Sequence, residues 1–287
     1  MLERILLKIA KKWVSGSTHE DALSSARICN NKGISAILNF LGEDTIDKRA
    51  IEQTVKEYFT LLGLLKSNTI NGCISVKPTQ IGLRVGYNEC LYNFRQIVRK
   101  AKSLDEFIWI DIESFQFVED TIAIYLELIK DYKKIGVALQ SYLKRSASDL
   151  VHLLEQGANI RIVKGAYKEN ESVAFQSMEN INSNFSKLMK LFFENSSTNS
   201  LLAVATHDSR LIDHAIELSH LLGTNKEQFE FQLLMGIHDE LKKSLIQRGF
   251  KVCEYIPYGN QWIPYSIRRI RERKRNILLL TRSIMPF

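Results

Sequence analysis

The sequence lacks the cysteine patterns that build disulfide frameworks or zinc sites. Its four cysteines are Cys29, Cys73, Cys90 and Cys253, and none of them has a partner at C-x-x-C spacing. Cys73 and Cys253 also lie within apolar runs. These features favour buried free thiols in a reducing compartment over disulfides or bound zinc.

Long apolar runs and linkers are missing as well. No run reaches the length of a transmembrane helix, and the N-terminus has neither the apolar core nor the cleavage site of a signal peptide. No segment rich in Pro, Gly or Ser and no shift of composition marks a boundary between domains. We therefore expect a single-domain, cytoplasmic protein.

What is present is an ordinary globular composition with a modest excess of positive charge. Of the 287 residues, 45% are hydrophobic and 25% are charged, and Lys and Arg exceed Asp and Glu by 39 to 32. The net charge of +7 favours anionic partners such as phosphate-bearing cofactors, small acids or a membrane surface. This charge is too diffuse to indicate nucleic acid.

Apolar runs rich in branched residues recur along the chain and read as near-continuous strands covered on both faces, as in a parallel sheet. The eight runs are Ile34–Leu41, Cys73–Val76, Phe107–Ile112, Gly136–Tyr142, Asn159–Val163, Leu201–Ala205, Phe229–Leu234 and Lys251–Ile256. Helical patterns lie between them, so the sequence predicts a closed (β/α)8 barrel of the TIM type, an α/β fold. A doubly wound sheet is the alternative, but neither G-x-G-x-x-G nor G-x-x-x-x-G-K-[ST] occurs at a suitable place.

Two helices are expected before the first strand. Leu2–Trp13 has an apolar helical stripe that suits packing or a membrane surface. Thr18–Lys32 begins with the capping-box pattern Ser17-x-x-Glu20 and ends at Gly33. The predicted organisation is therefore a pair of N-terminal helices over residues 1–32, packed on a barrel over residues 33–287.

Polar residues follow or end nearly every predicted strand. They are Lys77, Asp111, Gln140, Arg161, Lys164, Thr206, His207, Asp208, Gln232, Tyr255 and Tyr258. Taken singly, each has a plain structural explanation, such as Asp208 capping the helix that follows it. Because the carboxyl ends of barrel strands meet at one face, these groups together predict a ligand site.

The last helical segment, Trp262–Lys274, adds a second polar group to that face. One side of the helix would carry, at i, i+3, i+4 and i+7 spacing, Tyr265, Arg268, Arg269 and Glu272. Two guanidiniums with a neighbouring carboxylate suit the capture of a carboxylate or phosphate. By itself, this run is most simply interpreted as a basic helix face exposed to solvent. Because the segment follows the eighth strand, however, the helix would cross the mouth of the site. We therefore expect Arg268, Arg269 and Glu272 to face the site, whereas Arg271, Arg273 and Lys274 face solvent or a membrane surface.

The chemistry of the predicted ring is strongly cationic, with Asp111 as its clearest unpaired acid. A metal site fits poorly, because the adjacent His207 and Asp208 would point to opposite faces of a strand. Nucleophilic catalysis lacks a G-x-S-x-G motif. A Schiff base formed through Lys164 or Lys77 stays open as an alternative, as does a binding module that contacts anionic lipid or nucleic acid through the basic run.

Several motifs resemble those of the proline dehydrogenase family, in order, from about Trp13 to the end of the chain. The later ones are Arg161-Ile-Val-Lys-Gly-Ala-Tyr167, Ala205-Thr-His-Asp208, Phe229-Glu-Phe-Gln-Leu-Leu-Met-Gly236, Tyr255-Ile-Pro-Tyr-Gly259 and Tyr265-Ser-Ile-Arg-Arg-Ile-Arg-Glu272. The earlier ones are Ile37-Leu-Asn-Phe-Leu-Gly-Glu43, Ser75-Val-Lys-Pro-Thr-Gln-Ile-Gly82 and Val137-Ala-Leu-Gln-Ser-Tyr-Leu-Lys144. Pro78, directly after Lys77, departs from the pattern of many members.

The resemblance implies a compact, monofunctional flavoenzyme with a distorted barrel that holds FAD at its C-terminal face. Such an enzyme oxidises L-proline to 1-pyrroline-5-carboxylate by hydride transfer to flavin N5, the first step of proline catabolism. The electrons pass to a membrane quinone, so contact with the inner face of the cell membrane is expected. A separate pyrroline-5-carboxylate dehydrogenase would use the product.

The resemblance also implies roles for individual residues. The expected catalytic residues are Lys77, Asp111, Arg161 and Tyr255. The expected substrate-binding residues are Lys77, Leu234, Tyr255, Tyr265, Arg268, Arg269 and Glu272. The expected FAD-binding residues are Gln140, Arg161, Lys164, Gly165, Ala166, Thr206, His207 and Gln232. In this scheme Asp111 accepts a hydrogen bond from Tyr255.

Overall fold

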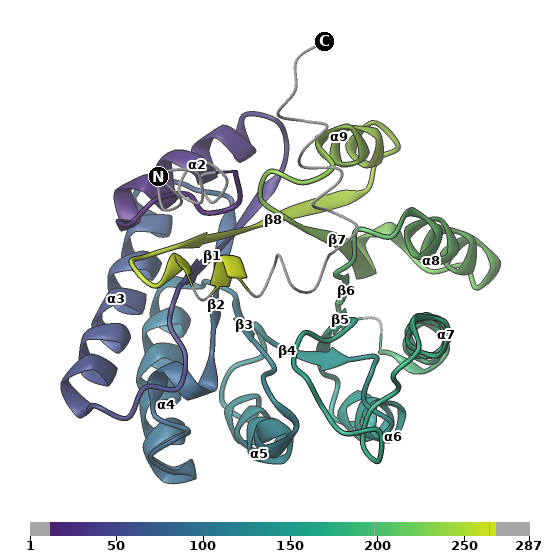
Figure 1. The fold of residues 1–287 in the computed structure, drawn as a ribbon. Coiled ribbons are helices and arrows are strands. Elements are labelled where there is room, and N and C mark those ends of the chain that lie inside the picture. Colours follow the sequence, from purple (N-terminus) through teal and green to yellow (C-terminus); the bar gives the residue numbers. More distant parts are fainter. Residues whose placement is uncertain (1–11, 198, 264, 268–287) are drawn as a thin grey trace.

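Eight parallel strands close into a barrel in the computed structural model, which describes residues 12–197, 199–263 and 265–267 (Figure 1). The strands are β1 (Ser35–Phe40), β2 (Gly72–Val76), β3 (Ile108–Ile110), β4 (Ile135–Gln140), β5 (Asn159–Val163), β6 (Leu202–Val204), β7 (Phe229–Leu234) and β8 (Lys251–Tyr258). All eight predicted strands are confirmed, with ends that shift by a residue or two. The predicted TIM-type barrel is therefore confirmed.

Helices surround the strands on the outside of the barrel. They are α2 (His19–Asn30), α3 (Lys48–Ser67), α4 (Tyr87–Leu104), α5 (Val118–Leu128), α6 (Ser146–Glu155), α7 (Met178–Asn195), α8 (Ser209–Leu221) and α9 (Asp239–Gln247). Short 3-10 turns precede three elements: η1 (Pro78–Ile81), η2 (Phe115–Phe117) and η3 (Lys226–Gln228). Pro78 opens η1, a position where a missing N–H is tolerated.

Apolar side chains fill both faces of the strands. Outward residues form one large core with the helices, while Ile37, Trp109, Ala203 and Cys253 pack together inside the barrel. Gly136 makes room for this inner layer, because a Cβ atom there would lie 2.2 Å from the Trp109 ring. A long register of six residue pairs between β1 and β8 closes the ring.

The helix α2 covers the junction of β1 and β8, where a helix after β8 would otherwise lie (Figure 1). Its capping box differs from the predicted one by one residue. Thr18 accepts from the N–H of Asp21, and Asp21 accepts from the N–H of Thr18, so the predicted pair Ser17 and Glu20 was wrong. The backbone becomes helical only after Thr18, which is extended.

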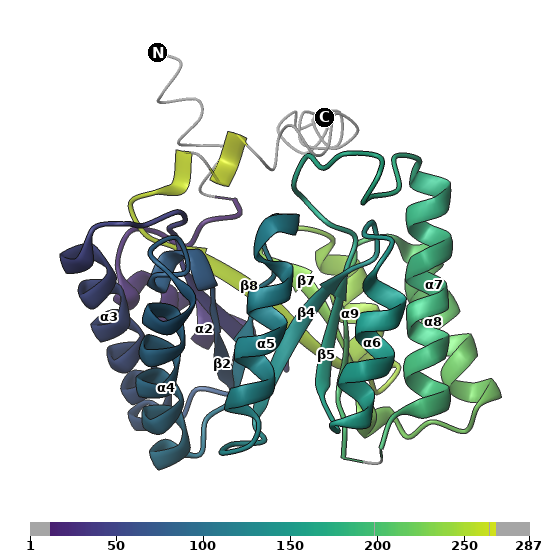
Figure 2. The ribbon, with the colours of Figure 1, turned by 90° about the horizontal axis from the view of Figure 1, so that it is seen from below.

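The two ends of the described chain meet near the carboxyl end of β1. Trp13 and Leu41 pack with Tyr265, and the Trp13 indole N–H donates to Ser266 Oγ at 3.1 Å. Figure 2 shows the short helical pieces around Tyr265 lying above the strands. The predicted helix Leu2–Trp13 falls almost entirely outside the described residues, and so does the predicted final helix from residue 268 onward.

Two further expectations concern thiols and membranes. The four cysteines are all described and all free, with Cys73 partly buried and the other three buried, which confirms the predicted free thiols. Among the residues that the structure describes, no helix is both long and apolar enough to cross a bilayer. The division into residues 1–32 and 33–287 stays a prediction.

Candidate active site

A cluster of buried charges lies at the carboxyl ends of the strands. Lys77 Nζ lies 2.7 Å from Asp111 Oδ2, and the Tyr255 hydroxyl donates to the same oxygen at 2.7 Å. Arg161 Nη1 and Ser75 Oγ both donate to Asp111 Oδ1, each at 2.6 Å. Asp111 therefore accepts from two cations and two hydroxyls, and the prediction that it is the unpaired acid of the ring was wrong.

Strand geometry brings these five residues together. Lys77 follows β2 two positions after Ser75, and Asp111 follows β3 two positions after Trp109, whose ring is inside the barrel. Side chains two apart along a strand share a face, so all of them point inward. Tyr255 approaches from β8, across β1 from β2. The ring of strands thus joins residues that are 34 to 178 positions apart in sequence.

The electrostatics of the cluster favour charged Asp111 and Lys77. Burial opposes the charged carboxylate, but Lys77 and Arg161 outweigh burial and hold the pKa of Asp111 below its usual value. Burial also opposes the ammonium, but Asp111 and then Glu43 raise the pKa of Lys77 above its usual value. Burial and Asp111 raise the pKa of Tyr255 well above its usual value. Lys77 is therefore a poor Schiff-base nucleophile, which requires a lowered pKa.

Arg161 is held on three sides. Its Nε donates to Gln232 Oε1 at 2.6 Å, its Nη1 contacts Asp111, and its guanidinium lies 4.6 Å from the centre of the Trp109 ring. Arg161 Nη2 is buried and has no hydrogen-bond partner among the described residues. The same holds for Gln140 Oε1, at the end of β4, whose Nε2 donates to a backbone carbonyl. One donor and one acceptor are thus available to a ligand.

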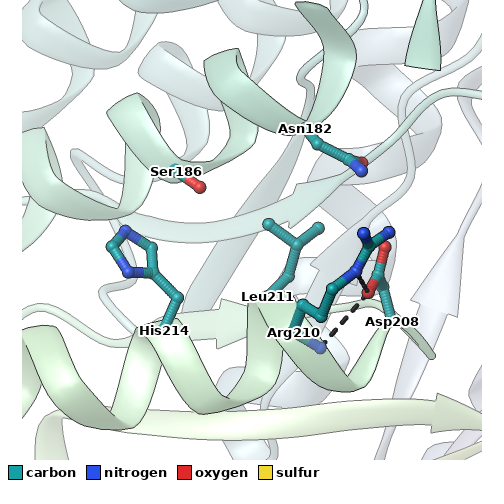
Figure 3. Close-up of a pocket in the computed structure, with 6 residues that line it drawn as sticks. All are labelled: Asn182, Ser186, Asp208, Arg210, Leu211 and His214. Atoms are coloured by element: carbon teal, nitrogen blue, oxygen red, sulfur yellow. Dashed lines mark hydrogen bonds and ion pairs between the residues drawn. The ribbon is translucent and has the colours of Figure 1, made fainter. Parts of the chain in front are cut away.

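Lys164 lies beyond the end of β5 and forms an ion pair with Asp208, with 3.0 Å between Nζ and Oδ2. Asp208 also caps α8 by accepting from the N–H of Arg210, as predicted for a helix starting here. Figure 3 shows Asp208 and Arg210 facing α7 across a cavity of about 280 Å³. The cavity is lined by Asn182, Ser186, Asp208, Arg210, Leu211 and His214. A cavity of about 420 Å³ among α4, α5 and α6 is lined by none of the predicted site residues.

Gly165 has a backbone that other residues rarely adopt. Its φ is +111°, and a Cβ atom would lie 2.3 Å from Cδ1 of Tyr142. Ala166 follows it in the same loop, after β5. Glycine is therefore required here both by the backbone conformation and by the Tyr142 ring packed against it.

His207 is fixed by a backbone contact at its ring. Its Nε2 accepts the N–H of Leu234 at 2.9 Å, which holds that nitrogen unprotonated and places the ring proton on Nδ1. Thr206 beside it is buried, and its hydroxyl accepts from the N–H of Asp208. In the described part of the chain, no group of three His, Cys, Asp or Glu side chains is placed to hold a metal ion.

Most of the predicted site residues thus fall into two described groups. Lys77, Asp111, Arg161, Gln232 and Tyr255 form one hydrogen-bonded network. The loops after β5 and β6 carry the second group, and Tyr265 is buried against Trp13 and Leu41. Arg268, Arg269 and Glu272 lie outside the described residues.

Two acids near the site, the buried Glu113 and the partly buried Glu230, were not predicted from the sequence. Glu113 is 3% exposed and accepts from both the N–H and the hydroxyl of Thr79, each at 2.7 Å. Glu230, on β7, accepts from Gln232 Nε2 at 2.6 Å. Both have a weak signal in the sequence, because each acid lies two positions from a predicted site residue and so shares its side of the strand or its extension.

Comparison with known proteins connects this site to one family. The family model described as proline dehydrogenase matches residues 22–279. Proline dehydrogenase 1 of Bacillus subtilis (strain 168) is 33% identical over 276 residues, which cover 96% of this chain and 90% of that protein. Proline dehydrogenase of Deinococcus radiodurans is 32% identical over 282 residues, with 96% and 90% covered.

A solved structure supports the fold. Proline utilization A (PutA) from Bdellovibrio bacteriovorus, inactivated by N-propargylglycine, superposes with a TM-score of 0.89 at 22% identity. The match covers 97% of this chain and 34% of that one, so this chain spans about a third of the length of PutA. At this identity the likeness concerns the barrel architecture.

Proposed function

This chain belongs to the proline dehydrogenase family of oxidoreductases, and from that premise we propose that it oxidises L-proline to 1-pyrroline-5-carboxylate with FAD. We further propose that a membrane quinone takes up the electrons and that a separate pyrroline-5-carboxylate dehydrogenase consumes the product. The family match supports proline oxidation as a first catabolic step. The cofactor, the acceptor and the residue roles rest on the geometry of the site and on the resemblance of its motifs.

The observation that carries the cofactor assignment is a pair of buried polar atoms in the site that have no hydrogen-bond partner in the described part of the chain. Arg161 Nη2 is a donor and Gln140 Oε1 is an acceptor, and both belong to strands whose carboxyl ends face the cluster. Flavin rings carry acceptor and donor atoms along one edge, so the two residues fit this cofactor. Lys164 and Gly165, directly after β5, offer a positive charge and a glycine backbone in a positive-φ conformation to its phosphates.

The substrate assignment follows from charge and shape. Lys77 is proposed to bind the proline carboxylate together with Arg268 and Arg269, with Glu272 orienting the two guanidiniums. The ring of the substrate would lie against Leu234, Tyr255 and Tyr265, which bring apolar surface to the same face. Tyr255 is kept in place for this purpose by its hydrogen bond to Asp111.

FAD, when bound, would accept the hydride, with its two electrons, that leaves proline C5. The protein holds the substrate in place and supplies positive charge from Arg161 where negative charge accumulates. The proline nitrogen must also release a proton. Asp111 is a poor base for it, because both its oxygens already accept hydrogen bonds and Lys77 and Arg161 lower its pKa. We propose that solvent accepts this proton.

The visible absorption spectrum tests the proposed function. Purified protein loaded with FAD should show flavin bands that bleach when L-proline is added without oxygen, and a quinone analogue should restore them. Arg161→Met should weaken the bleaching, whereas Arg99→Met, an exposed cation on α4, should not. Protein that takes up no FAD, or whose flavin L-proline leaves oxidised, would refute the proposal.

Borohydride separates this reaction from the Schiff-base alternative. Reduction in the presence of a carbonyl substrate such as pyruvate should leave no covalent adduct on Lys77 or Lys164, because both ammonium groups are ion-paired to carboxylates. A trapped adduct of substrate mass at either lysine, found by peptide mass spectrometry, would favour a lyase instead.

A further inference from the structure

Glu230 lies inside the barrel at the far end of a hydrogen-bond chain from the cluster. It accepts from Gln232 Nε2 at 2.6 Å, and Gln232 Oε1 accepts from Arg161 Nε at 2.6 Å. The chain spans β7 and β5, which are not adjacent strands. Ala203 on β6 pairs with both Arg161 and Glu230 in the strand register, and its small side chain leaves room for them to approach across it.

The orientation of the Gln232 amide is determined at both ends of this chain. A carboxylate oxygen can only accept, and Arg161 Nε can only donate. The amide must therefore turn its NH2 group toward Glu230 and its oxygen toward Arg161. Without Glu230, the amide could rotate by half a turn and place a donor against the Arg161 donor, which would push the guanidinium away.

Fixing the amide also fixes which nitrogen of Arg161 is available. Gln232 takes Nε, while Ser75 and Asp111 take Nη1. Nη2 is left without a partner among the described residues. Glu230 also places a second acid inside the barrel, so that two acids, Asp111 and Glu230, stand against the two cations Lys77 and Arg161.

We propose that Glu230 is a positioning residue of the redox site, which acts through Gln232 to hold Arg161 with Nη2 directed to the flavin and which moderates the positive charge there. This inference rests on the proposed function, because it takes FAD as the ligand of Nη2. It adds a residue to the site that touches neither cofactor nor substrate.

Two substitutions of Glu230 separate its hydrogen bond from its charge. In Glu230→Gln the new amide oxygen can still accept from Gln232, whereas Glu230→Met removes both acceptor and charge. We expect Glu230→Met to weaken FAD binding to the full-length protein about 10-fold, because a misplaced buried donor costs on the order of 1.4 kcal/mol. Glu230→Gln should restore the affinity and shift the flavin midpoint potential to a more positive value, since an anion near the reduced flavin is gone.

FAD affinity from fluorescence titration, the visible spectrum and the potential are the readouts, with Glu240→Gln on the exposed face of α9 as control. A Gln232→Met background should abolish the effect of Glu230→Met on affinity. Equal affinities of the two Glu230 variants, or an unchanged potential in Glu230→Gln, would overturn the proposal. If Glu230→Met does not fold, the potential of Glu230→Gln decides. Failure of the proposed function shows separately, as wild-type protein that binds no FAD or is not reduced by L-proline.

Discussion

Asp111 is the residue on which the charge balance of the site depends. It lies between Lys77 and Arg161, and each of those cations is itself at most 8% exposed. Buried cations without a counter-charge are strongly unfavourable, so the two basic residues require Asp111 as much as they hold it in place. Its removal should therefore affect folding as well as catalysis.

Asp111→Ala is expected to lower the free energy of unfolding by about 3–5 kcal/mol, because it leaves two buried cations unpaired. Urea denaturation of the FAD-free protein measures this loss without interference from ligand binding. Glu194→Ala breaks an ion pair on the surface of α7 and should change stability little. Equal losses of stability in the two variants would show that the buried charges of Lys77 and Arg161 do not depend on Asp111.

Glu113 gives stability a specific dependence on pH. Burial raises its pKa from 4.5 to about 7, while Lys77 and Thr79 act in the opposite direction. Between these values the folded protein binds a proton that the unfolded chain has released. Stability from this group is thus complete below pH 4.5 and is lost as the pH rises through about 7, with a slope of up to about 1.4 kcal/mol per pH unit.

Glu113→Gln should remove that slope. We expect the stability difference between wild type and variant to shift against the wild type as the pH rises from 5 to 8, as measured by urea denaturation at each pH. Glu240→Gln, on the surface of α9, should follow the wild type at every pH. Parallel profiles for Glu113→Gln and wild type would mean that Glu113 does not titrate in this range.

At the scale of elements, a buried ion pair joins α9 to β8 beside α2. Lys242 on α9 is 1% exposed and contacts Glu254 on β8, whose other carboxylate oxygen accepts from the Cys29 thiol of α2 at 3.4 Å. Burial and then Glu254 raise the pKa of Cys29 to about 12, so the thiol stays protonated and serves as a donor. This contact fastens α2 in the place of the helix that would follow β8.

Breaking one side of this pair should cost more than replacing both. Lys242→Met should destabilise the protein by about 3–5 kcal/mol because Glu254 then stays buried and unpaired. The double variant Lys242→Met with Glu254→Leu should recover most of the loss, since apolar residues of similar volume suit a buried position. Thermal unfolding of the single and double variants measures these losses of stability. A double variant that loses as much stability as the two single substitutions added together would show that Lys242 and Glu254 are not coupled.

The conformation of the loop after β5 depends on Gly165. Gly165→Ala should lower both stability, by at least about 1 kcal/mol, and FAD affinity, because of its positive φ and the contact with Tyr142. Gly63→Ala is the matched change within α3, where no atom lies within 4 Å, and it should stabilise the helix by about 1 kcal/mol. If Gly165→Ala bound FAD as tightly as the wild type, FAD would not approach the backbone of this loop closely.

At the scale of the whole molecule, the net charge of +7 bears on the proposed transfer of electrons to a membrane quinone. Positively charged residues are attracted to an anionic membrane surface, and salt screens this attraction. We expect the protein to sediment with vesicles that contain anionic lipid, less so as salt rises, and not with neutral vesicles. Binding that is equal on both kinds of vesicle would remove charge as the cause.

The basic run of the last segment is the proposed contact. Reversal of its three cations, Arg271, Arg273 and Lys274, to Glu should abolish vesicle binding. A matched reversal of three exposed cations on α3 and α4, Lys48, Arg49 and Arg99, should reduce it only in proportion to net charge. If the two triple variants reduced vesicle binding equally, the binding would depend on net charge and not on the basic run.

The barrel itself was predictable from sequence, because its signals are local. Asn159–Val163 and Phe229–Leu234 each carry apolar residues at every second position, and both became strands at the predicted bounds. The rule that strand ends converge then placed Lys77, Asp111 and Arg161 on one face. Apolar periodicity and strand polarity are properties of a few neighbouring residues, so a single sequence determines them.

Tertiary structure alone decided which of those polar groups pair. Asp111 looked unpaired in sequence, yet its partners lie 34, 50 and 144 positions away and reach it only when the barrel closes. The roles of Glu113, Glu230 and Lys242 depend likewise on residues from other strands or helices. Hydrogen-bond orientation and charge pairing are set by distances across the fold, and no local pattern in the sequence encodes them.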